Sequence, residues 1–124
     1  MIYGVGVDIV VVAQLEDLRG KYDDPFFRKT YTVKEFEAGM ERSDPIRYFA
    51  GRFAAKEAVF KALNVNSAAF RWSDIETLNN DSGLPCISLY GKSKEHFDEI
   101  GGRFLRVSIS YDSSYAVAFA LCEV

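Results

Sequence analysis

Hydrophobic positions follow two different periods along the chain. Some segments alternate apolar and polar residues, which predicts strands, and others repeat apolar residues at spacings of three and four, which predicts helices. Strands are expected over residues 2–12, 74–80, 85–90, 103–111 and 115–124, and helices over 13–20, 32–41, 45–63 and 91–102, with a helical turn over 26–31. This order, which ends in an antiparallel hairpin, is typical of an α+β fold with one long central helix.

Capping residues locate the starts of two helices. Thr32 is followed three residues later by Glu35, which is the pattern of a capping box. Asp44 is a suitable N-cap, and Pro45 is a favourable first residue for the long helix. We expect that helix to end at Asn64.

The first strand carries an acid among apolar residues. Alternation places Gly4, Gly6 and Asp8 on one face, and Val5, Val7 and Ile9 on the other. Glycine inside a strand often marks close approach by a ligand or another backbone. We therefore expect cleared space beside the carboxylate. The alternative is that Asp8 is an N-cap or a surface acid.

The long helix also carries charges on its apolar stripe. Its stripe consists of Ile46, Phe49, Ala50, Phe53 and Phe60. Glu57 falls between the last two, and Lys61 follows one turn later. These two residues form either an ordinary exposed i,i+4 pair or part of a site that a cation completes, because an unpaired charge in an apolar surrounding is costly. Asp8 and Glu57 together suggest an oxygen-ligand site for Mg²⁺.

Composition narrows the class of protein. The 124 residues are enough for one domain, residues 1–124, and the composition is that of a soluble globular protein. The net charge of −3 argues against sequence-independent binding to nucleic acid. No apolar run is long enough to cross a membrane, and the N-terminus does not resemble a signal peptide. Cys86 and Cys122 form no metal or disulfide motif, so we expect reduced thiols in a cytoplasmic protein, although a single disulfide is an alternative.

Several segments resemble, in the same order, the holo-acyl-carrier-protein synthase family of small 4′-phosphopantetheinyl transferases. They are GVGVDIVVV, TVKE, FAGRFAAKEAVFKAL, NNDSGLP and VSISYDSSYAVAFA, which together span nearly the whole chain. The combination of an early G-x-G-x-D-I with RFAxKEAxxKA is the most specific part. The resemblance implies transfer of 4′-phosphopantetheine from coenzyme A to a serine of an apo acyl carrier protein, with release of adenosine 3′,5′-bisphosphate. It also implies a need for Mg²⁺ and a homotrimer whose coenzyme A cleft lies between subunits.

The resemblance also assigns roles to individual residues. Asp8 and Glu57 would hold Mg²⁺ against the pyrophosphate, and Lys61 would lie beside the phosphates. Charge that builds up during attack at phosphorus would be stabilised by Mg²⁺ and Lys61. Glu57, directly or through a water, is the expected acceptor of the serine proton.

Further residues are assigned by position in the same way. Arg52 and Lys56 would make additional phosphate contacts or structural contacts. Pro85 and Ser110 match positions that line the coenzyme A cleft.

Three positions depart from the family pattern. Gln14 stands where many members have an arginine, and the surrounding AQLEDLRGK is nearly neutral, so steering of an acidic carrier should be weaker. A glycine-rich loop is replaced by NVNSAAF, in which Asn64 and Asn66 tolerate positive φ. Tyr111 stands where some members have a histidine.

Two further side chains are of types that often occur in functional sites. His96, the only histidine, is expected to be structural or solvated. Trp72 is expected in the core or an interface, with stacking on adenine as the alternative.

Two other functional classes compete with an active transferase. One is a non-catalytic relative that binds a carrier protein or coenzyme A without transfer. The other is an unrelated small α+β domain, such as a subunit of a structural trimer.

Overall fold

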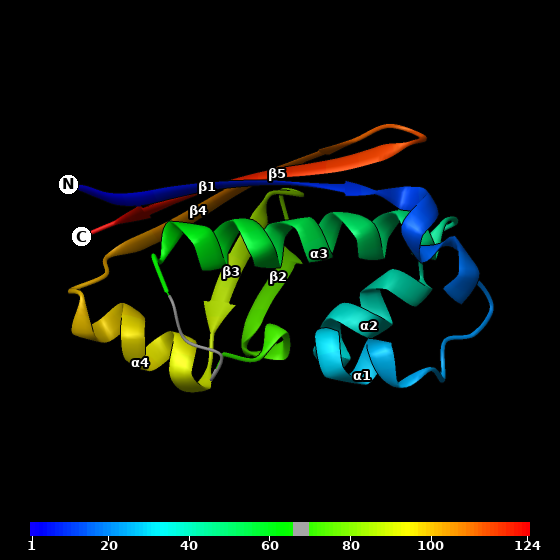
Figure 1. Ribbon diagram of the computed structural model, residues 1–124, viewed down its shortest axis with the longest axis horizontal. Helices are drawn as coiled ribbons and strands as arrows, with labels where there is room; N and C mark the ends of the chain where they lie inside the picture. Colours follow the sequence, from blue (N-terminus) through cyan, green and yellow to red (C-terminus); the bar gives the residue numbers. More distant parts are fainter. Residues whose placement is uncertain (66–69) are drawn as a thin grey trace.

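A three-stranded sheet lies over one long helix (Figure 1). The computed structural model describes residues 1–65 and 70–124. The sheet is antiparallel in the order β1-β5-β4, and its strands are β1 (Ile2–Val11), β4 (Phe104–Tyr111) and β5 (Tyr115–Glu123). The helix, α3 (Pro45–Ala62), packs against β1 and β5.

Most of the other elements lie on the side of α3 that faces away from this sheet, although the segment after β1 lies beside one end of the helix and the second pair of strands reaches past β4 (Figure 1). The other elements are η1 (Val12–Leu18), α1 (Pro25–Thr30), α2 (Val33–Met40), η2 (Trp72–Asp74), β2 (Ile75–Asn79), β3 (Pro85–Leu89) and α4 (Gly91–Glu99). Strands β2 and β3 form a separate antiparallel hairpin. The predicted α+β architecture, an antiparallel sheet packed on one long helix with shorter helices around it, is confirmed.

The predicted caps are present at both helix starts. The hydroxyl of Thr32 accepts a hydrogen bond from the backbone of Glu35, and the Glu35 carboxylate accepts one from the backbone of Thr32. The carboxylate of Asp44 accepts the backbone N–H of Arg47. At the other end of α3, Asn64 adopts a φ of 54°, as expected of the residue that ends the helix. The matching expectation for Asn66 lies outside the described residues.

One predicted helix has a different geometry. Residues 12–18 form a 3₁₀ helix rather than an α-helix, and it ends before Gly20. Its two buried side chains, Val12 and Leu15, are three residues apart. A 3₁₀ helix has three residues per turn, so it aligns this spacing on one side.

The glycines of β1 allow its backbone to touch α3. A Cβ added at Gly4 would lie 2.2 Å from the carbonyl oxygen of Ala62, and one at Gly6 would lie 2.0 Å from that of Ala58. The predicted close approach therefore involves another backbone, and the space beside Asp8 that we expected to be open on this face is filled by the helix. This approach brings α3 close to Asp8.

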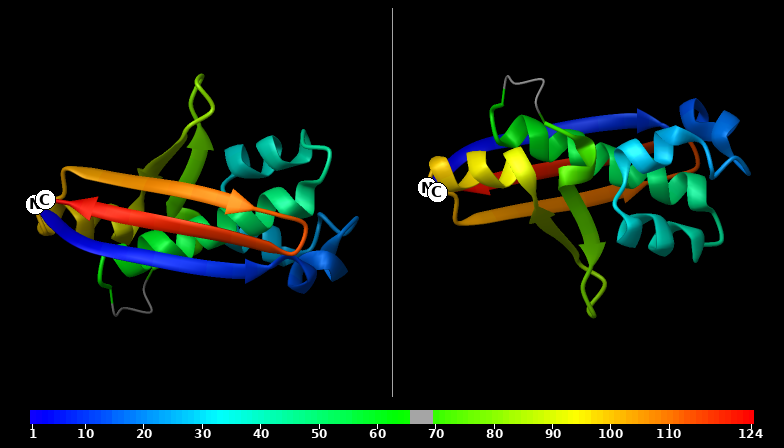
Figure 2. Two further views of the ribbon diagram at one scale, coloured as in Figure 1. Left: turned by 90° about the horizontal axis from the view of Figure 1, so that it is seen from above. Right: turned by 90° about the horizontal axis from the view of Figure 1, so that it is seen from below.

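The opposite face of the sheet is apolar and exposed. Figure 2 shows this face from above, with no element covering it. Val5, Val7 and Ile9 each expose more than half of their surface, and Tyr115 and Phe119 nearly half. An exposed apolar patch of this kind is typical of an interaction surface.

Candidate functional site

Two acids from distant parts of the chain meet where β1 crosses α3. Asp8 faces the helix, and its side chain keeps 12% of its surface exposed. Glu57 projects from α3, is half-buried, and lies beside Asp8, whose carboxylate helps to raise its pKa. The structure therefore brings together the two residues that the sequence suggested as a pair.

Lys61 completes this cluster from the next turn of α3. Its ammonium group donates a hydrogen bond to the carbonyl oxygen of Val7 at 2.9 Å and lies 3.3 Å from Oδ1 of Asp8. Its ion pair is with Asp8, so the interpretation of Glu57 and Lys61 as a simple exposed i,i+4 pair is wrong. More than half of the Lys61 side chain remains exposed and can reach a ligand.

The site carries more negative than positive charge at close range. Partial burial raises the pKa of Glu57 to about 7, and the neighbouring Asp8 carboxylate acts in the same direction, while Lys61 opposes them. Oδ2 of Asp8 is buried and has no hydrogen-bond partner among the described residues. A buried carboxylate oxygen without a partner is costly, and a bound cation would remove that cost.

The donor set suits a hard cation that brings most of its own ligands. Within residues 1–65 and 70–124, no group of three or more His, Cys, Asp or Glu side chains could hold a metal ion. Asp8 and Glu57 alone supply the carboxylate oxygens. Mg²⁺ commonly binds through one or two carboxylates plus waters and phosphate oxygens, so it fits this pair.

Lys56 lies on the opposite side of α3, although it directly precedes Glu57. Its side chain has 0% exposure, and its ammonium group donates to Oε1 of Glu35 at 2.6 Å, to the carbonyl of Trp72 at 3.0 Å and to the carbonyl of Ile75. Burial lowers the pKa of Lys56, and Glu35 counteracts this effect. All three donors are used inside the protein, so a phosphate has no access to this group.

Arg52 lies on that same side, near the β2–β3 hairpin. Its guanidinium stacks on Tyr48 at 4.5 Å and donates to Oδ1 of Asn79 at 2.9 Å. Its Nη1 is buried and has no partner within the described parts of the chain. Arg52 therefore retains one donor, but the structure does not bring it to Asp8.

Pro85 and Ser110 lie away from the acids within one chain. Ser110 is opposite Val117, which is opposite Ile9, so its side chain shares the outward face of the sheet, whereas Asp8 faces the helix. Pro85 begins β3, and its hairpin projects past β4, on the side opposite β1 (Figure 2). The predicted site residues thus form two groups that one chain does not join.

The remaining candidates make contacts inside the protein. Nε2 of His96 lies 2.8 Å from the carbonyl oxygen of Leu63 at the end of α3. The Trp72 ring contacts Phe53 and Phe60, with centroids 5.7 and 5.5 Å away. These contacts account for the positions of both side chains.

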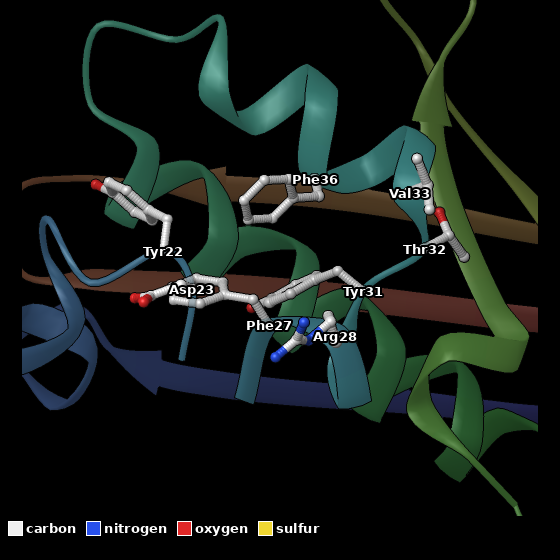
Figure 3. Close-up of a pocket in the computed structure, with 8 residues that line it drawn as sticks. All are labelled: Tyr22, Asp23, Phe27, Arg28, Tyr31, Thr32, Val33 and Phe36. Atoms are coloured by element: carbon white, nitrogen blue, oxygen red, sulfur yellow. The ribbon is translucent and has the colours of Figure 1, made fainter. Parts of the chain in front are cut away.

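A separate pocket between α1 and α2 is not the site. Its volume is about 270 Å³, and the rings of Tyr22, Phe27 and Phe36 surround it (Figure 3). None of the residues predicted to act in catalysis or ligand binding lines it. The candidate site is instead the charged cluster of Asp8, Glu57 and Lys61.

Comparisons with known proteins establish the class of protein. The chain belongs to the 4′-phosphopantetheinyl transferase superfamily, which it matches over residues 4–120. This membership excludes the alternative of an unrelated α+β domain.

Individual relatives share a more specific name than that of the superfamily. The chain is 38% identical over 121 residues to a holo-acyl-carrier-protein synthase of Natranaerobius thermophilus, covering 98% of this chain and 97% of that one. Its fold is similar to the crystal structure of the synthase of Neisseria meningitidis, with a TM-score of 0.87, 28% identity and complete coverage of both chains. It is also similar to the Helicobacter pylori synthase in complex with coenzyme A, with a TM-score of 0.81, 29% identity, and coverage of 96% and 99%.

Two further predictions concern membrane-spanning helices and disulfides. Within the described ranges, no helix is long and apolar enough to cross a membrane. Cys86 and Cys122 are both free, so the structure contains no disulfide between them.

Proposed function

We propose that this chain is a holo-acyl-carrier-protein synthase. It transfers 4′-phosphopantetheine from coenzyme A to a serine hydroxyl of an apo acyl carrier protein. The observation that carries this proposal is the meeting of Asp8 and Glu57, with Lys61 beside them, on the fold of this superfamily. The names of its relatives and the coenzyme A complex of a neighbour support the choice of substrates.

Asp8 and Glu57 would hold Mg²⁺. Support comes from Oδ2 of Asp8, which has no partner in the described parts of the chain, and from the raised pKa of Glu57, which results from partial burial and the neighbouring acid. When bound, Mg²⁺ would neutralise negative charge on the pyrophosphate of coenzyme A. Waters and phosphate oxygens would complete its coordination.

The protein's own residues would act on the proton and on the developing charge. The serine oxygen forms a bond to the β-phosphorus of coenzyme A, and the bond from that phosphorus to the bridging oxygen breaks. Adenosine 3′,5′-bisphosphate leaves with the bonding electrons. Glu57 would accept the serine proton, directly or through a water, because its carboxylate lies at the meeting point of Asp8 and Lys61, where the phosphorus would be held. Lys61 would stabilise charge on the phosphates through its exposed ammonium group.

The working enzyme would be a homotrimer with its sites between subunits. The separation of Pro85 and Ser110 from Asp8 within one chain supports this arrangement, since residues of a neighbouring subunit would complete the cleft. The exposed apolar face around Val7 and Phe119 gives a surface for assembly. A stable monomer in solution, measured by light scattering, would contradict this part of the proposal.

Among the other assigned residues, Arg52 is 3% exposed and its Nη1, which has no partner among the described residues, is buried, so a structural contact fits it better than a phosphate contact. Lys56 has no surface for such a contact. The carrier would be that of fatty-acid synthesis, in the cytoplasm, where free thiols such as Cys86 and Cys122 are usual.

A direct assay tests the function. The protein is incubated with coenzyme A, Mg²⁺ and an apo acyl carrier protein from the same organism, and the carrier is weighed by mass spectrometry. We expect the carrier to gain one phosphopantetheine, and we expect Asp8→Ala and Glu57→Ala to abolish the gain. Asp98→Ala, which removes an exposed acid of α4, is the matched control and should retain activity.

Other outcomes distinguish the alternatives. Binding of coenzyme A without any mass gain, with every carrier tested, would favour a non-catalytic relative. Indifference to both coenzyme A and carrier would contradict both functions.

A further inference from the structure

The rotation of α3 about its axis determines whether the proposed site exists. Successive residues of a helix point roughly 100° apart. Glu57 and Lys61 must both face Asp8, and a modest rotation would carry them away from it. The elements that fix this rotation are therefore functionally important.

On the side of the sheet, the directional contacts of α3 include the exposed ones of Lys61 with the carbonyl of Val7 and of Arg47 with that of Tyr111. The facing side chains are small: Ala54, Ala58 and Ala62 on the helix, and Ala116, Ala118 and Ala120 on β5, all with 0–1% exposure. Gly4 and Gly6 then bring the backbone of β1 against the helix. Small residues set a short distance between two elements, but they do not interlock as large side chains do. Along β1 and β5 the helix therefore packs through small residues.

The other side of α3 carries directional contacts that are buried. The buried ammonium group of Lys56 has three acceptors, on α2, η2 and β2. Its partner Glu35 is equally buried and also accepts the backbone N–H groups of Thr32 and Thr77, both at 2.9 Å. One ion pair thus joins α3 to three other elements through bonds of defined direction.

Stability alone does not account for this pair. Replacing both members of a buried ion pair by neutral residues is often neutral or stabilising, because the desolvation of two charges is costly. Buried ionic groups can, however, fix the register of packed elements. The pair lies one residue from Glu57, where register matters most.

We propose that Lys56 and Glu35 are positioning residues, which set the rotation of α3 so that Glu57 and Lys61 face Asp8. The inference rests on the proposed function of that site. The pair does not touch substrate or metal and acts through the orientation of the helix.

A double variant tests this inference. Lys56→Met with Glu35→Gln removes both charges together, leaves no unpaired buried charge, and keeps an acceptor for the backbone of Thr77. We expect a folded protein whose crystal structure shows Glu57 displaced from Asp8. Titration calorimetry with MgCl₂ should show binding weakened roughly 10- to 100-fold, the usual range when the residues that orient metal ligands are changed.

The control separates positioning from general destabilisation. Phe27→Leu truncates a buried ring of α1 and leaves the ion pair intact, so it should lower the melting temperature without changing Mg²⁺ affinity. Both proteins are measured well below their melting temperatures. If the double variant does not fold, Lys56→Gln with Glu35→Gln, which also leaves no unpaired charge and keeps a donor for the carbonyls, takes its place and should give a smaller displacement.

Two results would overturn the inference. One is a double variant in which Glu57 still contacts Asp8, and the other is a loss of Mg²⁺ affinity no greater than that of Phe27→Leu. A wild-type protein that binds no Mg²⁺ would contradict the proposed function instead, and the crystal structure of the variant would still decide the positioning role.

Discussion

The two sides of α3 carry similar residues and use them in opposite ways. Towards α2 and β2, Lys56 is wholly buried, and its donors are all satisfied by the protein. Towards β1, Lys61 is more than half exposed, and Asp8 keeps a buried oxygen without a described partner. Both sides contain a lysine–carboxylate pair, but only one has capacity left for a ligand. A buried charge therefore indicates a site only when its bonding is incomplete.

The largest expected effect is on stability. Lys56→Met leaves Glu35 as a buried, unpaired carboxylate, which should lower the free energy of unfolding by roughly 3–5 kcal/mol. Lys61→Met should lower it by about 1 kcal/mol or less, because the lysine is exposed. Urea denaturation measures both, and equal effects would contradict the contrast between the two sides.

For the rate of transfer we expect the reverse order, with the larger loss in Lys61→Met. Lys61→Met should reduce the transfer rate roughly 10²- to 10³-fold, the range for loss of one group that stabilises developing charge. The initial rate of phosphopantetheine transfer is measured at saturating Mg²⁺. Lys94→Met, an exposed lysine of α4, is the control and should behave like the wild type.

A smaller effect concerns the pH dependence of stability, which Glu57, on the side of α3 that faces β1, should influence. Without metal, the raised pKa of Glu57, about 7, means that the folded state holds a proton that the unfolded state releases near 4.5. This contribution to stability is complete below the lower value and is lost as the pH rises through about 7. Glu57→Gln should therefore raise the melting temperature by a few degrees at pH 8 and leave it unchanged at pH 4.

Addition of Mg²⁺ sharpens this prediction. At pH 8, MgCl₂ should stabilise the wild type because it binds only the folded state, and it should not stabilise Glu57→Gln. Differential scanning calorimetry measures both shifts. Equal stabilisation of the two proteins would show that Mg²⁺ binds elsewhere.

The smallest effect is expected in η1, which follows β1 in the chain. Gln14 is exposed, and Arg19 is paired with Glu16 and Asp44, so this segment attracts an acidic carrier only weakly. Gln14→Arg should raise kcat/KM for an acidic carrier a few-fold at low salt, and the gain should vanish at high salt. Gln14→Met, which adds no charge, should leave the rate unchanged.

Local sequence signals predicted much of the architecture and the placement of Asp8, one of the two acids of the site. The capping box of Thr32 and Glu35 and the Asp44–Pro45 start specify helix beginnings because they depend on neighbours in the chain. The placement of Asp8 beside two glycines also follows from alternation within one strand. That residues 1–124 act as one phosphopantetheinyl transferase domain remains a prediction.

The role of Glu35 could not be predicted in the same way. The capping box explains one of its hydrogen bonds, but Lys56 is 21 residues away, and nothing in the spacing connects them. Lys56 belongs to the same sequence motif as Glu57. The resemblance therefore allows either a phosphate contact or a structural contact for it. Only the packing of α2 and β2 around α3 made it inaccessible.

The sequence by itself determined which segments are helices and strands and which residue types could bind a cation and phosphates, because these depend on local periodicity and on side-chain chemistry. The tertiary structure decided which charges share a space. Asp8 and Glu57 meet because Gly4 and Gly6 let two backbones touch, whereas Ser110 lies on the outward face and Lys56 on the far side of the helix. Such proximity depends on how distant segments pack, and no local pattern encodes it.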